Sequence, residues 1–476
     1  MWWIIPLLLA AFFALLIVRA LLFKPKYKPA LNPAPVAVDE AHAYESLSRM
    51  VQCRTVSSYD KSMEDGDEFV KFHELLKERY PLLHAACPPE HIGRRGLLFH
   101  WKGKSGAEPS VYMSHYDVVP AEEAAWQKPP FSGLRENGEI WGRGTLDTKC
   151  TLCAALESAE LLLKQGFVPE NDIYFSFAGN EEIAGTDAPD IVETLRARNI
   201  TPALVVDEGG AVVSGIFPGL ASQCALIGTG EKGMLNLEFK VTSTGGHASA
   251  PPPHTPVGVL ACAVTKVEKK PFPRQMPKPT AEMFDTLGRY SSFGYRLLFA
   301  NLWCFQGLLD TFARSKGGEL NALMRTTCAF TMMQGSSATN VIPPSATVGA
   351  NLRLLGTETM ESAVEYIRSV IRDDSVELRV IHGMNPSPHS RTDTEGWRRL
   401  TQAVAETWPD AIVSPYMMFA CSDSRHYCRI SENVFRFSAM RLSADDRKRI
   451  HGNDERITEL QLKEALAFYL RILQKS

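Results

Sequence analysis

Acidic residues and one histidine follow short structural segments at four successive places in the first half of this chain. The four places are His115 with Asp117 after the segment 111–114, Asp147 after a glycine-rich turn, Glu181-Glu182 after the segment 173–177, and Asp207-Glu208 after the segment 203–206. Sites of open α/β sheets form at the carboxyl ends of the strands, so we expect these side chains to converge. Imidazole and carboxylate groups are zinc ligands, and the spacing therefore predicts a metal site.

Two metal ions about 3.5–4 Å apart can share a carboxylate and activate water toward a carbonyl group. The four places supply four ligands, with either member of each acidic pair open, and His451 in the loop before the last predicted helix supplies a fifth. Adjacent glutamates beyond a strand end point in different directions, so one of Glu181 and Glu182 can bind metal while the other accepts a proton. Asp117 can orient His115 through a hydrogen bond.

The segments that carry these residues alternate between strand-like and helix-like patterns. Strands are predicted at 96–101, 110–114, 173–177 and 203–206, and helices at 39–52, 68–80, 148–165 and 189–198. This alternation predicts an α/β fold with a mixed, mostly parallel sheet and helices on both of its faces.

A different pattern begins near residue 231. From Met234 to Val241 apolar and polar residues alternate, which is typical of an antiparallel strand with one exposed face. Further strands at 346–354 and 376–381, with helices at 255–268 and 357–372, predict an inserted α+β lid or dimerisation domain. The predicted organisation is an anchor at 1–23, a linker at 24–38, a catalytic domain at 39–230 and 384–476, and a lid domain at 231–383 with an insertion at 269–319.

Composition narrows the class of protein. The 476 residues suffice for two domains, and the formal net charge of −3, without a basic stripe, argues against a nucleic-acid partner. Ten cysteines are scattered, and the one C-x-x-C pair, Cys150 and Cys153, lies one turn apart on a predicted helix. We expect these two side chains to be core residues rather than a redox or zinc pair, because no second pair follows at zinc-finger spacing.

The first 23 residues are nearly all apolar, and a membrane-spanning helix needs about 20 such residues. No basic segment precedes them, which favours an uncleaved, single-pass membrane anchor over a cleaved signal peptide. Lys24, Lys26 and Lys28 follow the apolar run, so the positive-inside rule favours the cytoplasmic side for the folded part without deciding it.

The insertion at 269–319 is rich in aromatic residues. They are Phe284, Tyr290, Phe293, Tyr295, Phe299, Trp303, Phe305 and Phe312. Helix-like spacing of this kind is typical of core or interface packing. A lipophilic substrate wall and a membrane-facing patch are the two alternatives.

The chemistry-bearing motifs resemble those of the zinc aminoacylase/carboxypeptidase family, which includes acetylornithine deacetylase, succinyl-diaminopimelate desuccinylase and glutamate carboxypeptidase. The motifs are His115-Tyr-Asp117, Gly142-Arg-Gly-Thr-Leu-Asp147, Glu181-Glu182 and Asp207-Glu208. The resemblance covers nearly everything from residue 40 onward. It is greatest to the Gly-Xaa carboxypeptidase (carboxypeptidase S) branch, which includes N-fatty-acyl-amino-acid hydrolases.

The resemblance implies a two-zinc centre, in which cobalt or manganese can replace zinc. Asp147 would bridge the ions, one held also by His115 and Asp207, the other by Glu182 and His451. Glu181 would be the general acid/base and Asp117 its supporting carboxylate. The family usually has a second aspartate after the bridging one, joined by a cis peptide, and Thr148 stands at that position here.

The resemblance also assigns roles in the lid domain. His247 in Gly245-Gly-His247 would reach the active site of the neighbouring subunit in a homodimer and steady the oxyanion. Asn340 and Arg353 would hold the free carboxylate of the substrate, and the segment 422–426 resembles a substrate-side loop.

Together these expectations describe a membrane-anchored, two-zinc amidohydrolase. It would cleave the amide of an N-acyl amino acid, or the last peptide bond of a short peptide with a free carboxylate. The alternative is a non-catalytic binding protein or receptor on the same fold, which the loss of a ligand or of Glu181 would favour. No such loss is visible in the sequence.

Overall fold

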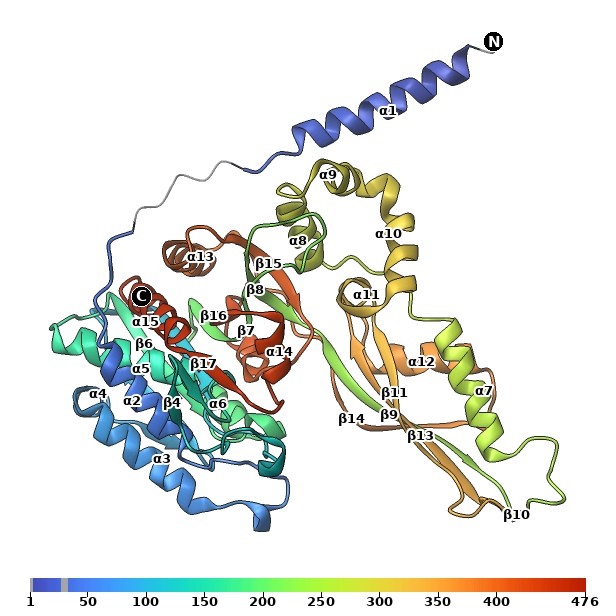
Figure 1. The fold of residues 1–476 in the computed structure, drawn as a ribbon, viewed down its shortest axis with the longest axis horizontal. Helices are drawn as coiled ribbons and strands as arrows, with labels where there is room; N and C mark the ends of the chain where they lie inside the picture. The colour runs from blue at the N-terminus through green and yellow to red at the C-terminus, as the bar shows by residue number, and fades with distance from the viewer. Residues whose placement is uncertain (1–2, 27–32) are drawn as a thin grey trace.

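The computed structural model describes residues 3–26 and 33–476 (Figure 1). Its centre is an eight-stranded sheet with the strand order β1-β2-β6-β3-β7-β16-β8-β15. The bounds are β1 Glu90–Ile92, β2 Gly96–Trp101, β3 Ser105–His115, β6 Asn171–Ala178, β7 Leu204–Val213, β8 Cys224–Glu231, β15 Ile412–Met418 and β16 Val434–Leu442. The central strands β6, β3, β7 and β16 are parallel, and β8 with β15 forms a second parallel pair. The predicted mixed, mostly parallel sheet is confirmed.

Apolar residues on both faces of this sheet explain its two layers of helices. Leu97, Phe99, Tyr112 and Phe175 face a core shared with helices α2 (Glu40–Val51), α3 (Gly66–Arg79), α4 (Pro81–Ala86), α5 (Lys149–Lys164) and α15 (Glu459–Leu473). Their strand neighbours Leu98, Val111, Met113 and Tyr174 face the opposite way, against α6 (Asp187–Ala197). Successive side chains of a strand point to opposite faces of the sheet, so the same strands contribute residues to both cores. Cys150 and Cys153 are buried in the first of them, as predicted.

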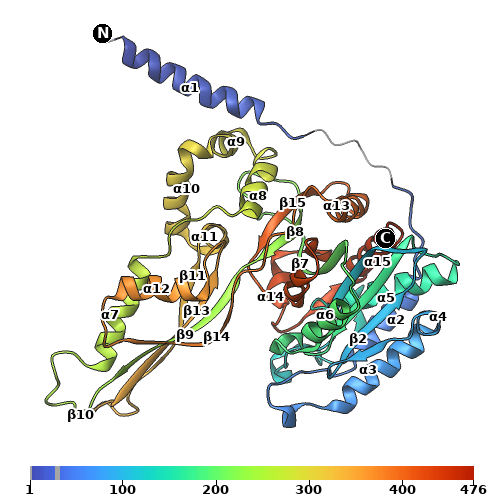
Figure 2. The ribbon, with the colours of Figure 1, turned by 180° about the vertical axis from the view of Figure 1, so that it is seen from behind.

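A second, four-stranded antiparallel sheet has the order β11-β13-β9-β14. Its strands are β9 Gly233–Thr242, β11 Thr327–Gln334, β13 Ser345–Leu354 and β14 Glu377–Met384. The apolar residues predicted on one face of β9 are buried against α7 (Pro256–Lys269) and α12 (Met360–Ile371). At one end of this unit, remote from the large sheet, the short strands β10 (Gly246–His247) and β12 (Val341–Ile342) pair (Figure 2).

Four helices, α8 (Lys278–Gly288), α9 (Phe293–Ala300), α10 (Leu302–Lys316) and α11 (Gly318–Met324), form the insertion. Helix α8 packs on β15, and the rings of Phe284 and Phe299 meet Phe217 in the core. For these two residues, core packing is confirmed. Phe293, Tyr295, Trp303 and Phe312 are instead exposed.

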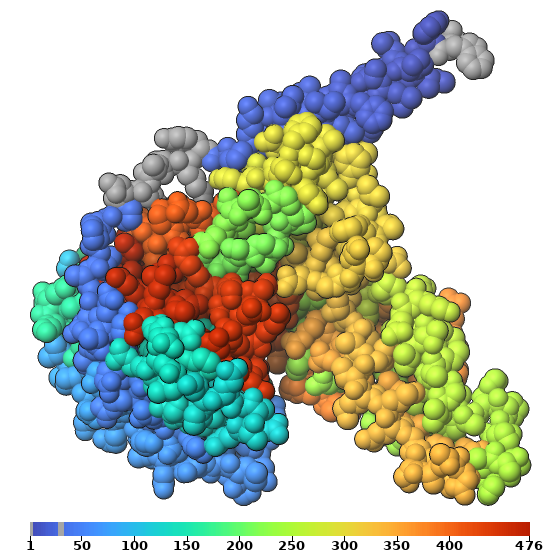
Figure 3. Space-filling view, viewed as in Figure 1, coloured from blue at the N-terminus to red at the C-terminus, as the bar shows by residue number. Residues whose placement is uncertain are grey.

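The N-terminal helix α1 (Ile4–Leu22) projects from the body and lies against α9 (Figure 3). By length and composition it can cross a membrane, although signal sequences share this property. Remaining elements are a small sheet of β4 (Leu134–Glu136), β5 (Glu139–Trp141) and β17 (Arg456–Thr458), and the helices α13 (Glu395–Thr407) and α14 (Ala444–Arg449). The 3-10 helices are η1 (Lys61–Met63), η2 (Glu123–Ala125), η3 (Glu181–Ile183) and η4 (Asp423–Arg429).

Candidate metal centre

Four of the predicted ligands meet at the carboxyl edge of the large sheet. The Nε2 atom of His115, the last residue of β3, lies 3.1 Å from Oδ1 of Asp147. The other carboxylate oxygen of Asp147, Oδ2, lies 2.9 Å from Nε2 of His451, which is also 3.1 Å from Oε2 of Glu182. Asp147 therefore faces one histidine with each oxygen, which is the arrangement that a bridging carboxylate requires.

The backbone fixes which nitrogen of His115 faces the cluster. Its Nδ1 atom lies 3.0 Å from the carbonyl oxygen of Asp117, so this nitrogen is the donor and Nε2 is the acceptor or ligand. The Asp117 carboxylate is fully buried and accepts hydrogen bonds from the backbone N–H groups of Glu181 and Glu182 and from the hydroxyl of Ser57. Asp117 therefore connects His115 to the Glu181-Glu182 segment through hydrogen bonds.

Glu455 holds the turn that presents Asp147, and sequence reasoning missed it. Its buried carboxylate accepts hydrogen bonds from the backbone N–H groups of Gly144, Leu146 and Asp147 and pairs with Arg143 at 2.7 Å. Its position in the sequence, four residues after the predicted ligand His451, could have indicated a role at the site. The peptide bond between Asp147 and Thr148 is cis, so threonine occupies this position with the family's backbone geometry.

The two acids of β7 occupy different surroundings. Glu208 lies 3.5 Å from Nε2 of His115 through Oε1. Asp207 is more deeply buried, and its Oδ2 accepts a hydrogen bond from the backbone N–H of Ser424, in η4. Glu208, and not Asp207, belongs to the cluster by distance.

The electrostatics of the cluster are those of crowded buried acids around two histidines. Burial opposes the ionisation of Asp147, but hydrogen bonds from His115 and His451 hold the pKa of Asp147 well below its ordinary value. Hydrogen bonds to Asp147 and Glu182 raise the pKa of His451 to about 10. Burial, with nearby carboxylates such as Glu208, raises the pKa of Glu181 well above its ordinary value.

This donor set fits zinc-class ions. Candidate ligand atoms of His115, Asp147 and Glu182 all lie within 4.8 Å of one another, and so do those of His115, Glu181 and Glu208. Imidazole nitrogens combined with carboxylate oxygens suit zinc, and several buried carboxylates in one place need cationic partners.

The site residues predicted in and beside the four-stranded sheet divide into two groups. Arg353, on β13, directs Nη1 to within 3.6 Å of Sγ of Cys421, beside the 422–426 segment that also holds Asp207. His247 and Asn340 lie at the remote end of the four-stranded unit, where the N–H of Ala248 donates to the carbonyl of Asn340. His247 is exposed, and its Nδ1 pairs with Ser249. Within one chain, the structure brings Arg353 to the catalytic side but not His247 or Asn340.

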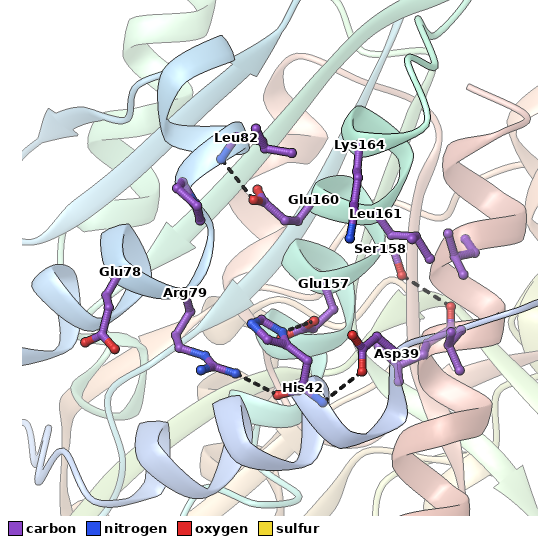
Figure 4. A pocket seen from close by; sticks show the side chains of 14 residues that line it. Asp39, His42, Glu78, Arg79, Leu82, Glu157, Ser158, Glu160, Leu161 and Lys164 are labelled. Atoms are coloured by element: carbon purple, nitrogen blue, oxygen red, sulfur yellow. Dashed lines mark hydrogen bonds and ion pairs between the residues drawn. The ribbon is translucent and has the colours of Figure 1, made fainter.

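A separate cavity of about 380 Å³ is lined by residues of α2, α3, α4, α5 and α15 (Figure 4). His42 pairs there with Glu157 at 2.9 Å, and Arg79 donates to the carbonyl of His42. Its lining includes none of the predicted site residues, so it takes no part in the metal centre.

The fold and the cluster define a metal-dependent hydrolase built on a mixed α/β sheet. Residues 111–475 match the family model described as peptidase family M20/M25/M40, and the chain belongs to this family. Its members are metal-dependent peptidases and amidohydrolases, and the resemblance seen in the sequence is confirmed.

Relatives and solved structures support this assignment. Over 440 residues the chain is 36% identical to carboxypeptidase S-like 2 of Dictyostelium discoideum, covering 91% of this chain and 84% of that protein. It is 34% identical to the N-fatty-acyl-amino acid synthase/hydrolase PM20D1 of Xenopus tropicalis, covering 91% and 85%. Its fold matches the M20 metallo-carboxypeptidase Sso-CP2 of Sulfolobus solfataricus with a TM-score of 0.67 at 15% identity, covering 92% and 99%.

Proposed function

We propose that this protein is a two-metal amidohydrolase that cleaves N-acyl amino acids or the last peptide bond of short peptides with a free carboxylate. The observation that carries the proposal is the Asp147 carboxylate, whose two oxygens face two different histidines. Its relatives named for carboxypeptidase and N-fatty-acyl-amino-acid activity support the substrate class.

Each residue has a defined part in the proposed reaction. His115, Asp147, Glu182 and His451, with one acid of β7, would hold two zinc-class ions. When bound, such ions lower the pKa of a shared water and polarise the scissile carbonyl. Glu181 accepts the proton of the attacking water and passes it to the leaving nitrogen. Arg353 and Asn340 bind the substrate carboxylate, and His247 donates a hydrogen bond to the developing oxyanion.

We further propose that α1 is a retained anchor and that the four-stranded unit is a lid through which two subunits pair. An exposed, mainly apolar helix and the exposed edge strands β11 and β14 support these proposals.

A direct assay tests the proposed function. Purified full-length protein should hydrolyse N-acyl amino acids or dipeptides, and a chelator should abolish the activity. Blocking the substrate carboxylate as an amide should weaken turnover, because Arg353 and Asn340 lose their partner. Tight binding of these compounds without any hydrolysis would favour the non-catalytic alternative.

The number of bound ions is a separate prediction. Elemental analysis of freshly purified protein should find about two zinc-class ions per chain, because the Asp147 carboxylate of the proposed site would be shared by two ions. A reproducible value near zero in fully active protein would contradict the metal centre.

The acids of β7 can be distinguished by metal content. We propose Asp207 as the ligand, because a hydrogen bond from the N–H of Ser424 holds its carboxylate, and ligating carboxylates are usually held in this way. The proximity of Glu208 to His115 then reflects attraction between the two side chains without a bound ion. Asp207→Asn should lower the content toward about one ion per chain, whereas Glu208→Gln should keep about two. The reverse result would assign the ligand role to Glu208.

A further inference from the structure

Helices α9 and α10 carry exposed aromatic side chains. Outside residues 3–22, the exposed Phe, Tyr and Trp side chains of the described chain are Tyr59 and four residues of these two helices, namely Phe293, Tyr295, Trp303 and Phe312. From Tyr290 to Leu309, Arg296 is the one charged residue. We call the exposed side chains of α10, Trp303, Leu308 and Phe312, the aromatic surface. Apolar exposure concentrated in one place marks an interaction site.

The core-facing side of α10 already has its partners. An α-helix turns by about 100° per residue, which places Trp303, Leu308 and Phe312 on one half of the helix. Leu309 and Ala313 on the other half are buried, whereas the three outer side chains are 50–63% exposed. The outer face therefore does not serve to pack α10 on its own chain.

Helix α1 is docked beside the aromatic surface by specific contacts. Leu16 and Ala20 are buried, and the side chain of Asn301 donates to the carbonyl of Leu16. Arg19 donates in return to the carbonyl of Ala300 and to Oδ1 of Asn301, at 3.0 and 3.1 Å. These contacts satisfy the polar groups at the base of α1 and make α1 continuous with the insertion (Figure 3).

The aromatic surface begins where the apolar helix meets the body. The rings of Phe12 and Trp303 pack edge to face at 6.2 Å. Basic groups lie at the C-terminal end of the same helix, α1, where Arg289 stacks over Phe23 and donates to the carbonyl of Lys24. Tyrosine and tryptophan concentrate at membrane–water interfaces, where basic side chains meet anionic headgroups.

We propose that the aromatic surface lies in the headgroup region of a phospholipid bilayer, beside the point where α1 enters it. Continuity with an apolar helix, the nearly uncharged segment 290–309 and the neighbouring basic groups favour a lipid surface over a second copy of the chain. The inference rests on the proposed retention of α1 and is independent of the proposed amide hydrolysis.

Two native cysteines provide a matched test. Among the described residues, Cys262 on α7 and Cys304 on α10 are the exposed cysteines. Cys304 lies on the outer face of α10, between the angular positions of Trp303 and Leu308. Cys262 lies on α7, which packs on the four-stranded sheet, and it serves as the control position. Full-length Cys262→Ser and Cys304→Ser proteins, each keeping one exposed thiol, are labelled with an environment-sensitive fluorophore. They are then reconstituted into phosphatidylcholine/phosphatidylserine vesicles that contain spin-labelled lipid.

We expect lipid quenching of the fluorophore at Cys304 to exceed that at Cys262 severalfold, because interfacial helices bury their apolar face about 5–10 Å deep. Leu308→Glu should reduce the quenching at Cys304 without changing hydrolysis of a water-soluble N-acyl amino acid. Equal quenching at both positions would overturn the proposal. Formation of a Cys304–Cys304 disulfide dimer without lipid quenching would also overturn it, by assigning the surface to a second copy. Absence of hydrolysis in every one of these proteins would contradict the proposed function and leave the membrane proposal unaffected.

Discussion

Replacement of Glu181 by glutamine should lower kcat by about 10²–10⁴-fold, the usual effect of removing a general acid/base. Glutamine keeps the size and hydrogen-bonding capacity of glutamate but cannot accept a proton at neutral pH. Glu181 lies in the cluster with His115 and Glu208, and its backbone N–H is held by Asp117. The loss should therefore be chemical rather than structural, and single-turnover kinetics would locate it in the bond-breaking step.

The adjacent Glu182 provides the matched control. Its Oε2 faces His451 at 3.1 Å, so Glu182→Gln should lower the metal content, whereas Glu181→Gln should keep about two ions per chain. Both residues donate their N–H groups to Asp117, so either substitution leaves the same backbone support. If Glu181→Gln loses metal while Glu182→Gln keeps it, the two roles are exchanged.

Much of the candidate metal centre could be predicted because its determinants are local. His115 ends β3 and Glu182 follows β6, and these two parallel strands bring their carboxyl ends to one edge of the sheet. Asp147 follows a recognisable glycine-rich turn instead. The sequence could not rank Asp207 against Glu208, because their difference depends on the N–H of Ser424, more than two hundred positions away.

The strand β8 shows what local patterns do not predict. The sequence predicts a change of pattern near residue 231 and no strand just before it, yet β8 ends there, is entirely buried and pairs in parallel with β15. Glu231 at its end forms a fully buried ion pair with Arg436 at 2.6 Å. A buried acid needs such a partner, but this one lies on a strand that the chain reaches only after the four-stranded unit.

The aromatic insertion could be recognised but not interpreted from sequence. Phe299 and Trp303 lie four residues apart, which suggests one helical face. In the structure they belong to two helices, because α9 ends at Ala300 and α10 begins at Leu302. Phe299 therefore enters the core while Trp303 is exposed beside α1.

His247 can reach a metal centre by two routes. His247 lies on β10, at the end of the four-stranded unit remote from the large sheet (Figures 1 and 2). It can stabilise an oxyanion only if the lid closes over its own metal centre or if the histidine enters the site of a second subunit. Symmetric pairing through an exposed sheet edge would favour the second route.

Complementation between two inactive proteins separates these routes. His247→Ala lacks the oxyanion donor and should lose about 10²–10³-fold in rate. Glu181→Gln lacks the proton acceptor. In a mixed dimer with shared sites, one centre keeps its own Glu181 and receives a native His247 from the other subunit. Co-expression should then restore up to about a quarter of wild-type activity with statistical pairing. Tandem affinity purification would isolate the mixed dimers. If the purified mixed dimers are no more active than the mean of the two mutant proteins alone, His247 either acts in its own chain or takes no part in the reaction.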